Sequence, residues 1–248
     1  RNTRKPMLTR LQMMVALGAA TLPLPLSAAT VPVTLRPGPA FTRIGSRDIA
    51  MLGFNGTWPG PEIRLRQNVI LRARVENGLE DGTLVHWHGI RLPNAMDGVN
   101  VLTQDVIIPN EGYEYRFPVP DAGTYWYHSH YLSYEQVARG LFGPLIVEEP
   151  APPDVDQDIT AILFDIRLDD TGQFDMEFDR ADFITAGRLG DLMTTFLSSE
   201  QARLGDHIRL RLINPTPDRI FEIRIDGLTG FVWPMTGCRC PSWFRWAI

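Results

Sequence analysis

The amino-acid sequence predicts an all-β fold, a Greek-key sandwich of short strands, and three observations lead to it. Apolar and polar residues alternate over many short stretches from residue 30 onward, as strands with one buried face require. The 21 Gly and 20 Pro residues, about one residue in six, stand between these stretches as turn signals. Outside the N-terminus, we find no segment with a strong helical period. Many strands with turns between them are typical of an antiparallel sandwich.

Seven strands are predicted in the first 150 residues. The clearest is Glu-Ile-Arg-Leu-Arg at 62–66, which alternates strictly, and the strand that follows it stops at the Asn-Gly turn at 77–78. Aromatic and β-branched residues, which favour strands, dominate the fifth and sixth. The predicted strands are 31–35, 62–66, 69–75, 83–88, 113–117, 124–128 and 141–147.

A proline-rich stretch at 149–153 is predicted to separate two domains, a complete one over 30–150 and an incomplete one over 151–232. The second contains predicted strands at 158–165, 207–213 and 220–225, and 188–204 is ambiguous. Residues 233–248 show no alternation and hold Cys238 and Cys240, too close together for an ordinary disulfide. We interpret them as an aberrant tail, with a genuine short tail as the alternative.

Residues 1–29 have the pattern of an export signal. Arg10 precedes an apolar run at 11–26, and Leu-Ser-Ala-Ala at 26–29 predicts cleavage after Ala29. Pro23 and Pro25 argue against a membrane-spanning helix. An ordinary N-terminal helix is the alternative, and the export route stays open because the signal has no Arg-Arg pair. We expect a periplasmic or otherwise exported protein with no stable membrane insertion after signal removal.

The overall charge gives no sign of a nucleic-acid partner. Lys and Arg number 24 against 29 Asp and Glu, for a net charge of -5. Nucleic-acid binding domains are commonly basic, so we expect no such partner here.

Four of the five histidines form two His-x-His pairs, His86 with His88 and His128 with His130. Residues two apart in a strand point to the same face, so each pair presents two imidazoles together. Imidazole suits copper, zinc, iron and nickel. One pair alone is ambiguous, but two pairs on neighbouring strands would place four nitrogen donors around one cavity. The sequence therefore predicts a metal site.

Zinc hydrolases also use His-x-His pairs, but the flanking residues favour them less. A metallo-β-lactamase pattern would continue to Asp-His, where this chain has Gly89-Ile90. The pair of an amidohydrolase lies in an α/β barrel, and no strand–helix alternation is seen. A cupin would need a Glu shortly after the pair, and 91–94 supplies none. A zinc hydrolase stays a weaker alternative.

Taken together, the motifs strongly resemble those of the multicopper oxidases, a family that includes laccases, ascorbate oxidase and bacterial copper-resistance enzymes. They are His-Trp-His-Gly-Ile from His86, Met-Asp-Gly-Val from Met96, Leu-Thr-Gln from Leu102, Gly-Thr-Tyr-Trp-Tyr-His-Ser-His from Gly123 and Gly-Leu-Phe-Gly-Pro-Leu-Ile-Val from Gly140. The resemblance covers roughly residues 30–230.

This resemblance implies cupredoxin-like sandwiches and copper chemistry. In the full family pattern, a type 1 copper takes electrons from a reducing substrate, phenolic or metal-ion, and a type 2/type 3 cluster reduces dioxygen to water. By motif, His86 would be a type 2 ligand, and His88, His128 and His130 would be type 3 ligands. Asp97 matches a carboxylate that assists proton delivery; the alternative is a turn residue before Gly98.

The family's remaining ligand motifs, His-x-x-His-x-His and His-Cys-His, have no counterpart here. No His follows His207, and Cys240 stands between Arg and Pro. We therefore expect no type 1 site, half of the cluster ligands, and the N-terminal portion of a longer exported oxidase, inactive alone. The alternative is a non-catalytic periplasmic copper-binding module. We expect His207 on the surface and both Trp87 and Trp126 in the sandwich core.

Overall fold

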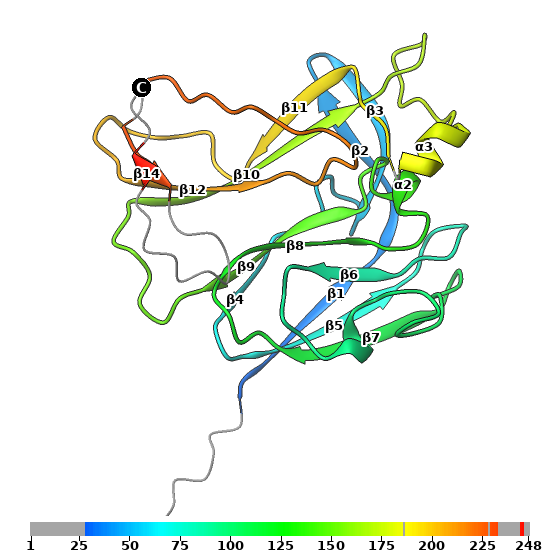
Figure 1. Cartoon of the computed structure of the whole chain (residues 1–248), viewed down its shortest axis with the longest axis horizontal. Helices are drawn as coiled ribbons and strands as arrows, with labels where there is room; N and C mark the ends of the chain where they lie inside the picture. The colour runs from blue at the N-terminus through cyan, green and yellow to red at the C-terminus, as the bar shows by residue number, and fades with distance from the viewer. Residues whose placement is uncertain (1–27, 186, 228, 233–243, 246–248) are drawn as a thin grey trace, which may run out of the picture.

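The computed structural model describes residues 28–185, 187–227, 229–232 and 244–245, and almost all of its regular structure is β (Figure 1). The predicted export signal lies outside the described residues apart from residues 28–29. The predicted tail, with both cysteines, lies outside them apart from 244–245. Within the described part of the chain, no helix is long and apolar enough to cross a membrane.

The elements follow one another along the chain as short strands with three brief helical turns. They are β1 (Thr30–Leu35), β2 (Pro37–Ile44), β3 (Arg47–Phe54), β4 (Ile63–Arg66), β5 (Ile70–Glu76), β6 (Val85–His88), η1 (Asn94–Met96), β7 (Gly112–Pro118), β8 (Gly123–Ser129), α2 (Ser133–Gln136), β9 (Phe142–Glu148), β10 (Gln157–Ile166), α3 (Arg180–Thr185), β11 (Leu192–Leu197), β12 (Ile208–Ile213), β13 (Phe231–Val232) and β14 (Phe244–Arg245).

Two sheets form the predicted sandwich in the first part of the chain. One has the strand order β1-β5-β7 and the other β4-β9-β8-β6. Alternate residues of each strand point into the space between the sheets, where Leu71 and Phe117 of the first sheet join Trp87 and Tyr127 of the second in one buried cluster. This core confirms the predicted all-β fold, in which alternate residues of each strand are buried. It also fixes which residues of β6 and β8 must face the other way.

Strand pairing differs in part from the predicted antiparallel sandwich, because three pairs are parallel. β1 runs parallel to β5, β4 to β9, and β10 to β12. Parallel neighbours need a crossover connection, and each of these pairs joins strands that are far apart in sequence. Local turn signals carry no information about such pairs.

A second hydrophobic cluster joins residues from both sides of the proline-rich stretch. The β2–β3 hairpin contributes Ile49 and Met51, β9 contributes Phe142, and β10 contributes Ile162 and Phe164. Ring centroids of Phe142 and Phe164 lie 4.8 Å apart. The sheet β11-β10-β12 therefore packs against the first sandwich through a shared apolar contact, with the strands lying above it in Figure 1. The predicted domain limits stay a prediction.

An arginine on β12 ties the same two parts together through polar contacts. Arg211 donates to both carboxylate oxygens of Asp158 at 2.6 and 2.7 Å and to the hydroxyl of Thr124 on β8 at 3.0 Å. Its side chain is 2% exposed. A buried guanidinium requires such complete pairing, because an unpaired buried charge is strongly destabilising.

Two predictions for the second part of the chain have clear outcomes. The ambiguous stretch 188–204 contains β11. The predicted strand at 220–225 is wrong, because those residues form no strand and Ile220 is 95% exposed. Phe221, Ile223 and Ile225 alternate with Glu222 and Arg224 as in a strand, but no strand in the described part of the chain pairs with them.

Candidate metal centre

The two histidine pairs lie at the ends of adjacent strands. In the antiparallel ladder between β6 and β8, His86 is directly opposite His128, and Val85 is opposite Ser129. Val85 and Trp87 point into the sandwich core, so the imidazoles of His86 and His88 must point to the opposite face. The sequence positions that build the core therefore also direct the histidines outward to one side.

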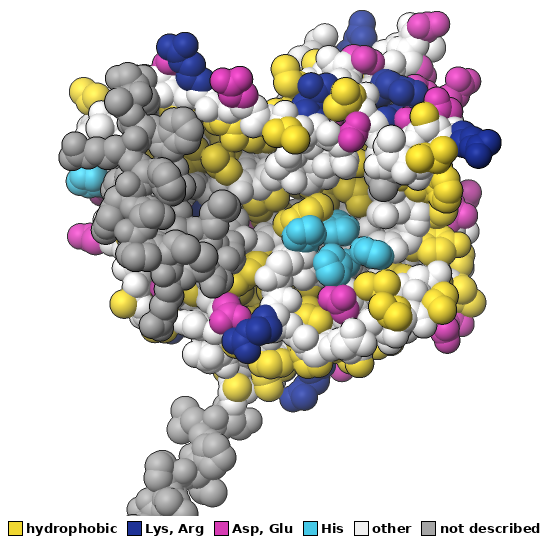
Figure 2. All heavy atoms as spheres, in the orientation of Figure 1, with side chains coloured by type: hydrophobic (Ala, Val, Ile, Leu, Met, Phe, Trp, Pro, Cys, Tyr) yellow, Lys and Arg dark blue, Asp and Glu magenta, His cyan; other side chains and the backbone are white. Residues whose placement is uncertain are grey.

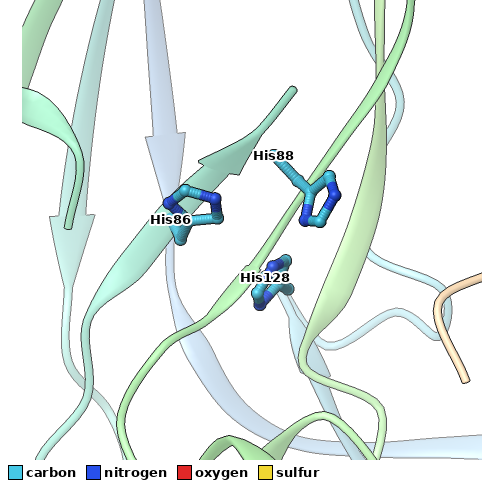
Figure 3. A group of neighbouring side chains, drawn as sticks. All are labelled: His86, His88 and His128. Carbon is cyan, nitrogen blue, oxygen red and sulfur yellow. The ribbon is translucent and has the colours of Figure 1, made fainter. Parts of the chain in front are cut away.

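Three of the four imidazoles converge on one small space. Ligand nitrogens of His86, His88 and His128 all lie within 4.8 Å of one another, and Figure 3 shows their rings turned towards that space. The ring centroid of His130 lies 5.4 Å from that of His86 and 6.1 Å from that of His128. His130 is thus adjacent to the group of three without belonging to it. Figure 2 shows a group of histidine side chains gathered near the centre of this face of the molecule.

Backbone carbonyls set the tautomers of two of these rings. Nδ1 of His86 lies 2.8 Å from the carbonyl oxygen of Asp97, and Nδ1 of His128 lies 2.8 Å from that of Ser129. Because a carbonyl can only accept, each Nδ1 carries the proton and each Nε2 keeps its lone pair. Nε2 of His128 is buried without a hydrogen-bond partner. A buried acceptor without a hydrogen-bond partner is destabilising unless its lone pair binds another group, such as a metal ion.

Burial favours the neutral form of three of the four rings, those of His88, His128 and His130. Burial, and then the nearby charge that His86 would carry, lowers the pKa of both His88 and His130. For His128, burial outweighs the opposing hydrogen bond to Ser129 and lowers the pKa to about 3. Neutral imidazole is the form that coordinates a metal, so these three rings do not have to lose protons first.

Tryptophan side chains lie on both sides of the histidine-bearing strands, and the prediction for them is half right. Trp87 is fully buried in the core as predicted. Trp126 is not in the sandwich core but stacks on His128 at 4.2 Å and on His88 at 4.8 Å between ring centroids. Because Trp126 stands two residues before His128, it shares the histidine face of β8.

Asp97 lies beside His86, as the motif spacing led us to expect. One of its carboxylate oxygens is 3.4 Å from Nδ1 of His86, and its side chain is 35% exposed. It ends the short η1 turn and precedes Gly98, whose φ of +70° is a conformation that glycine adopts easily. A Cβ at Gly98 would collide with the carbonyl oxygen of Val85, so only glycine brings the Asp97 loop this close to β6.

The remaining histidine takes no part in the cluster. The side chain of His207 is 84% exposed and faces Asp156, which confirms that it is a surface residue. One residue near the cluster was not predicted from the sequence: Gln136 of α2, which is 3% exposed and accepts a hydrogen bond from the hydroxyl of Ser129, the residue after His128. No spacing rule singles out a lone Gln, although its position six residues after His130 was visible.

The donor set fits copper chemically. Imidazole nitrogens suit copper among the first-row metals, and the Nε2 of His128, which is buried without a hydrogen-bond partner, is available to bind one. Zinc accepts the same donors, so the donors alone do not distinguish the two metals.

Comparisons with known proteins point to one family. A family model described as "Multicopper oxidase" matches residues 40–152, which include all four paired histidines and Asp97. Among curated proteins, the multicopper oxidase MmcO of Mycobacterium tuberculosis is 32% identical over 87% of this chain and 48% of its own length. The copper resistance protein A homolog of Pseudomonas syringae pv. tomato is 34% identical over 70% of this chain and 38% of its own length.

Solved structures agree with these sequence matches. Lac15 from a marine microbial metagenome superposes with a TM-score of 0.72 at 44% identity, over 81% of this chain and 52% of that one. A multi-copper oxidase from Pseudomonas thermotolerans gives a TM-score of 0.66 at 33% identity, over 77% of this chain and 47% of that one. The chain thus spans about half the length of these relatives, or less.

Proposed function

This chain belongs to the multicopper oxidase family and has its cupredoxin-like β architecture, and from that premise we propose that it is the N-terminal portion of an exported oxidase. In this proposal, the complete enzyme oxidises a phenolic or metal-ion substrate one electron at a time and reduces dioxygen to water. The observation that carries the proposal is the cluster of converging imidazoles around the unpartnered Nε2 of His128.

The four paired histidines would hold copper, with His86 in the type 2 role and His88, His128 and His130 in the type 3 role. When bound, copper would supply the one-electron steps of dioxygen reduction. The chain's own residues would prepare the site: the carbonyls of Asp97 and Ser129 hold two rings in the tautomer that frees Nε2.

Asp97 would serve proton delivery. Reduction of dioxygen to water consumes protons, and a partly exposed carboxylate beside a ligand ring can pass them inward from solvent. Its place between solvent and His86 supports this role. Substitution by Asn would keep the size and the backbone bond to His86 while removing the proton carrier. We therefore expect Asp97→Asn to retain bound copper and to lower the turnover of the complete enzyme.

Copper binding by this chain tests the first step of the proposal. We expect the folded 248-residue chain to bind Cu(II), and His86→Ala or His128→Ala to weaken that binding by about 10-fold or more. His207→Ala is the matched control and leaves the affinity unchanged, because the His207 ring is exposed, faces Asp156 and is not among the converging ligands. Equal affinity in the wild type and in His128→Ala would overturn the proposal.

A non-catalytic copper-binding module is the second candidate, because three ligand nitrogens already converge within this chain. The two candidates differ in one observable, oxygen consumption with a phenolic substrate. A complete enzyme containing this sequence would consume oxygen in proportion to substrate oxidised. A module would hold copper stoichiometrically without turnover.

A further inference from the structure

We propose that Gln136 is a positioning residue, whose side-chain amide joins the two histidine-bearing strands and sets the direction of His128. The inference rests on the proposed copper-binding role of the cluster. Gln136 lies at the end of α2, is 3% exposed, and is not one of the three converging ligands.

The amide of Gln136 has one possible orientation. Its Nε2 donates to the carbonyl oxygen of Gly82 at 2.8 Å, and this oxygen can only accept. Its Oε1 therefore faces two hydroxyl groups, those of Thr83 at 3.0 Å and Ser129 at 2.5 Å. A buried side chain with all of these bonds made holds its surroundings firmly, because a flipped amide would turn its NH2 group away from the Gly82 carbonyl and leave that buried donor bond unmade.

These three contacts reach both histidine pairs. Gly82 and Thr83 lie just before β6, separated from it by Leu84, and β6 carries His86; Ser129 stands between His128 and His130. The strand ladder itself ends at the pair of Val85 with Ser129. Gln136 thus continues the connection between the two strands beyond the last ladder pair.

Ser129 transmits the position of Gln136 to the ring of His128. The Ser129 hydroxyl is held by Gln136, and the Ser129 carbonyl accepts the Nδ1 proton of His128. The backbone is tied to the same helix, since Ser129 N–H donates to the carbonyl of Leu141 and Leu141 N–H donates to the carbonyl of Gln136. Movement of Ser129 would rotate the ring acceptor and with it the direction of Nε2.

The test compares variants of the full 248-residue chain with Cu(II) alone as the probe. Gln136→Met keeps the length of the side chain and removes its three hydrogen bonds. We expect its Cu(II) affinity to fall about 10- to 100-fold, the range found for residues that orient metal ligands, with an altered Cu(II) paramagnetic resonance spectrum. Thr83→Val removes one hydroxyl group, and its Cu(II) affinity should lie between those of Gln136→Met and the wild type. Thr83→Ser keeps the hydroxyl group, and its Cu(II) affinity should match the wild type.

A control separates positioning from stability. Val147→Ala removes a fully buried side chain from β9, at the far end of the sheet from His128. We expect it to lower the unfolding midpoint while leaving Cu(II) affinity and spectrum unchanged. If Gln136→Met folds and binds Cu(II) like Val147→Ala, the proposal is wrong. If Gln136→Met does not fold, equal Cu(II) affinities for Thr83→Val and Thr83→Ser overturn it.

A metal-free measurement keeps the proposal apart from copper binding. The His130 amide donates to the Leu84 carbonyl at 3.1 Å, just beyond the ladder. We expect hydrogen exchange at this amide to be about 10-fold faster in Gln136→Met than in Val147→Ala. If the wild type fails to bind Cu(II), the proposed function fails, and this exchange rate alone then decides the role of Gln136; equal rates would reject it.

Discussion

Phe164 offers the sharpest test of how the two parts of the chain depend on each other. It lies on β10, is 0% exposed, and its ring centroid is 4.8 Å from that of Phe142 and 5.7 Å from that of Trp58. Truncation of a buried Phe to Ala costs about 3–5 kcal/mol. Since this ring packs against two aromatic side chains from the first part of the chain, we expect Phe164→Ala to cost about 4 kcal/mol. In a chain of this size that corresponds to a fall in Tm of roughly 8–16 °C.

The assay is urea denaturation followed by tryptophan fluorescence, because Trp58 contacts the substituted ring directly. Phe183→Ala is the matched control: it is the same substitution at a residue that is 64% exposed, and it should cost less than about 1 kcal/mol. A cost below about 1 kcal/mol for Phe164→Ala would refute the reasoning. So would two separate transitions in the wild type of which the substitution shifts only one.

Three further predictions concern backbone and charge. Gly98→Ala should lower the free energy of unfolding by about 2 kcal/mol or more in urea denaturation, because alanine combines a φ of +70° with a collision against Val85. Val101→Gly should raise it by about 1 kcal/mol, since Val101 has φ +68° and, at 89% exposure, almost no packing to lose; a destabilised variant would contradict this. Burial would raise the pKa of Asp158, but Arg211, helped by Arg64 and Arg209, outweighs burial and lowers the pKa. This carboxylate therefore stabilises the folded state above its unfolded pKa, and that stability is lost as the pH falls through its folded pKa. Stability measured from pH 6 to pH 3 should therefore fall less steeply in Arg211→Met than in the wild type.

The histidine face could be predicted from the sequence because it depends on local geometry alone. Alternation placed His86 and His88 on one side of a strand and Trp87 in the core, and the structure has them so. The same rule, applied to the spacing between Trp126 and His128, would have placed Trp126 beside the imidazoles. The prediction for Trp126 was wrong because Trp126 is two residues before His128, and residues two apart in a strand share a face.

Other features depend on contacts that no local pattern encodes. The β2–β3 hairpin escaped prediction because β2 begins with Pro-Gly-Pro, which is typical of a turn, although Gly45 at its tip gave a usable signal. The parallel partners and the shared aromatic contact at Phe164 join residues far apart in the chain. Gln136 is likewise defined by three partners, none of which its own sequence position identifies.

The strict alternation of β6 has a consequence for insertions and deletions in the gene. One added residue between His86 and His88 would move one imidazole into the sandwich core and send a core side chain to solvent. The reading frame could be intact and every other residue present, yet the hydrophobic core and the histidine cluster would be damaged by the same event. We therefore expect length variation among natural relatives to collect in the loop after Gly89 and to be absent within this strand.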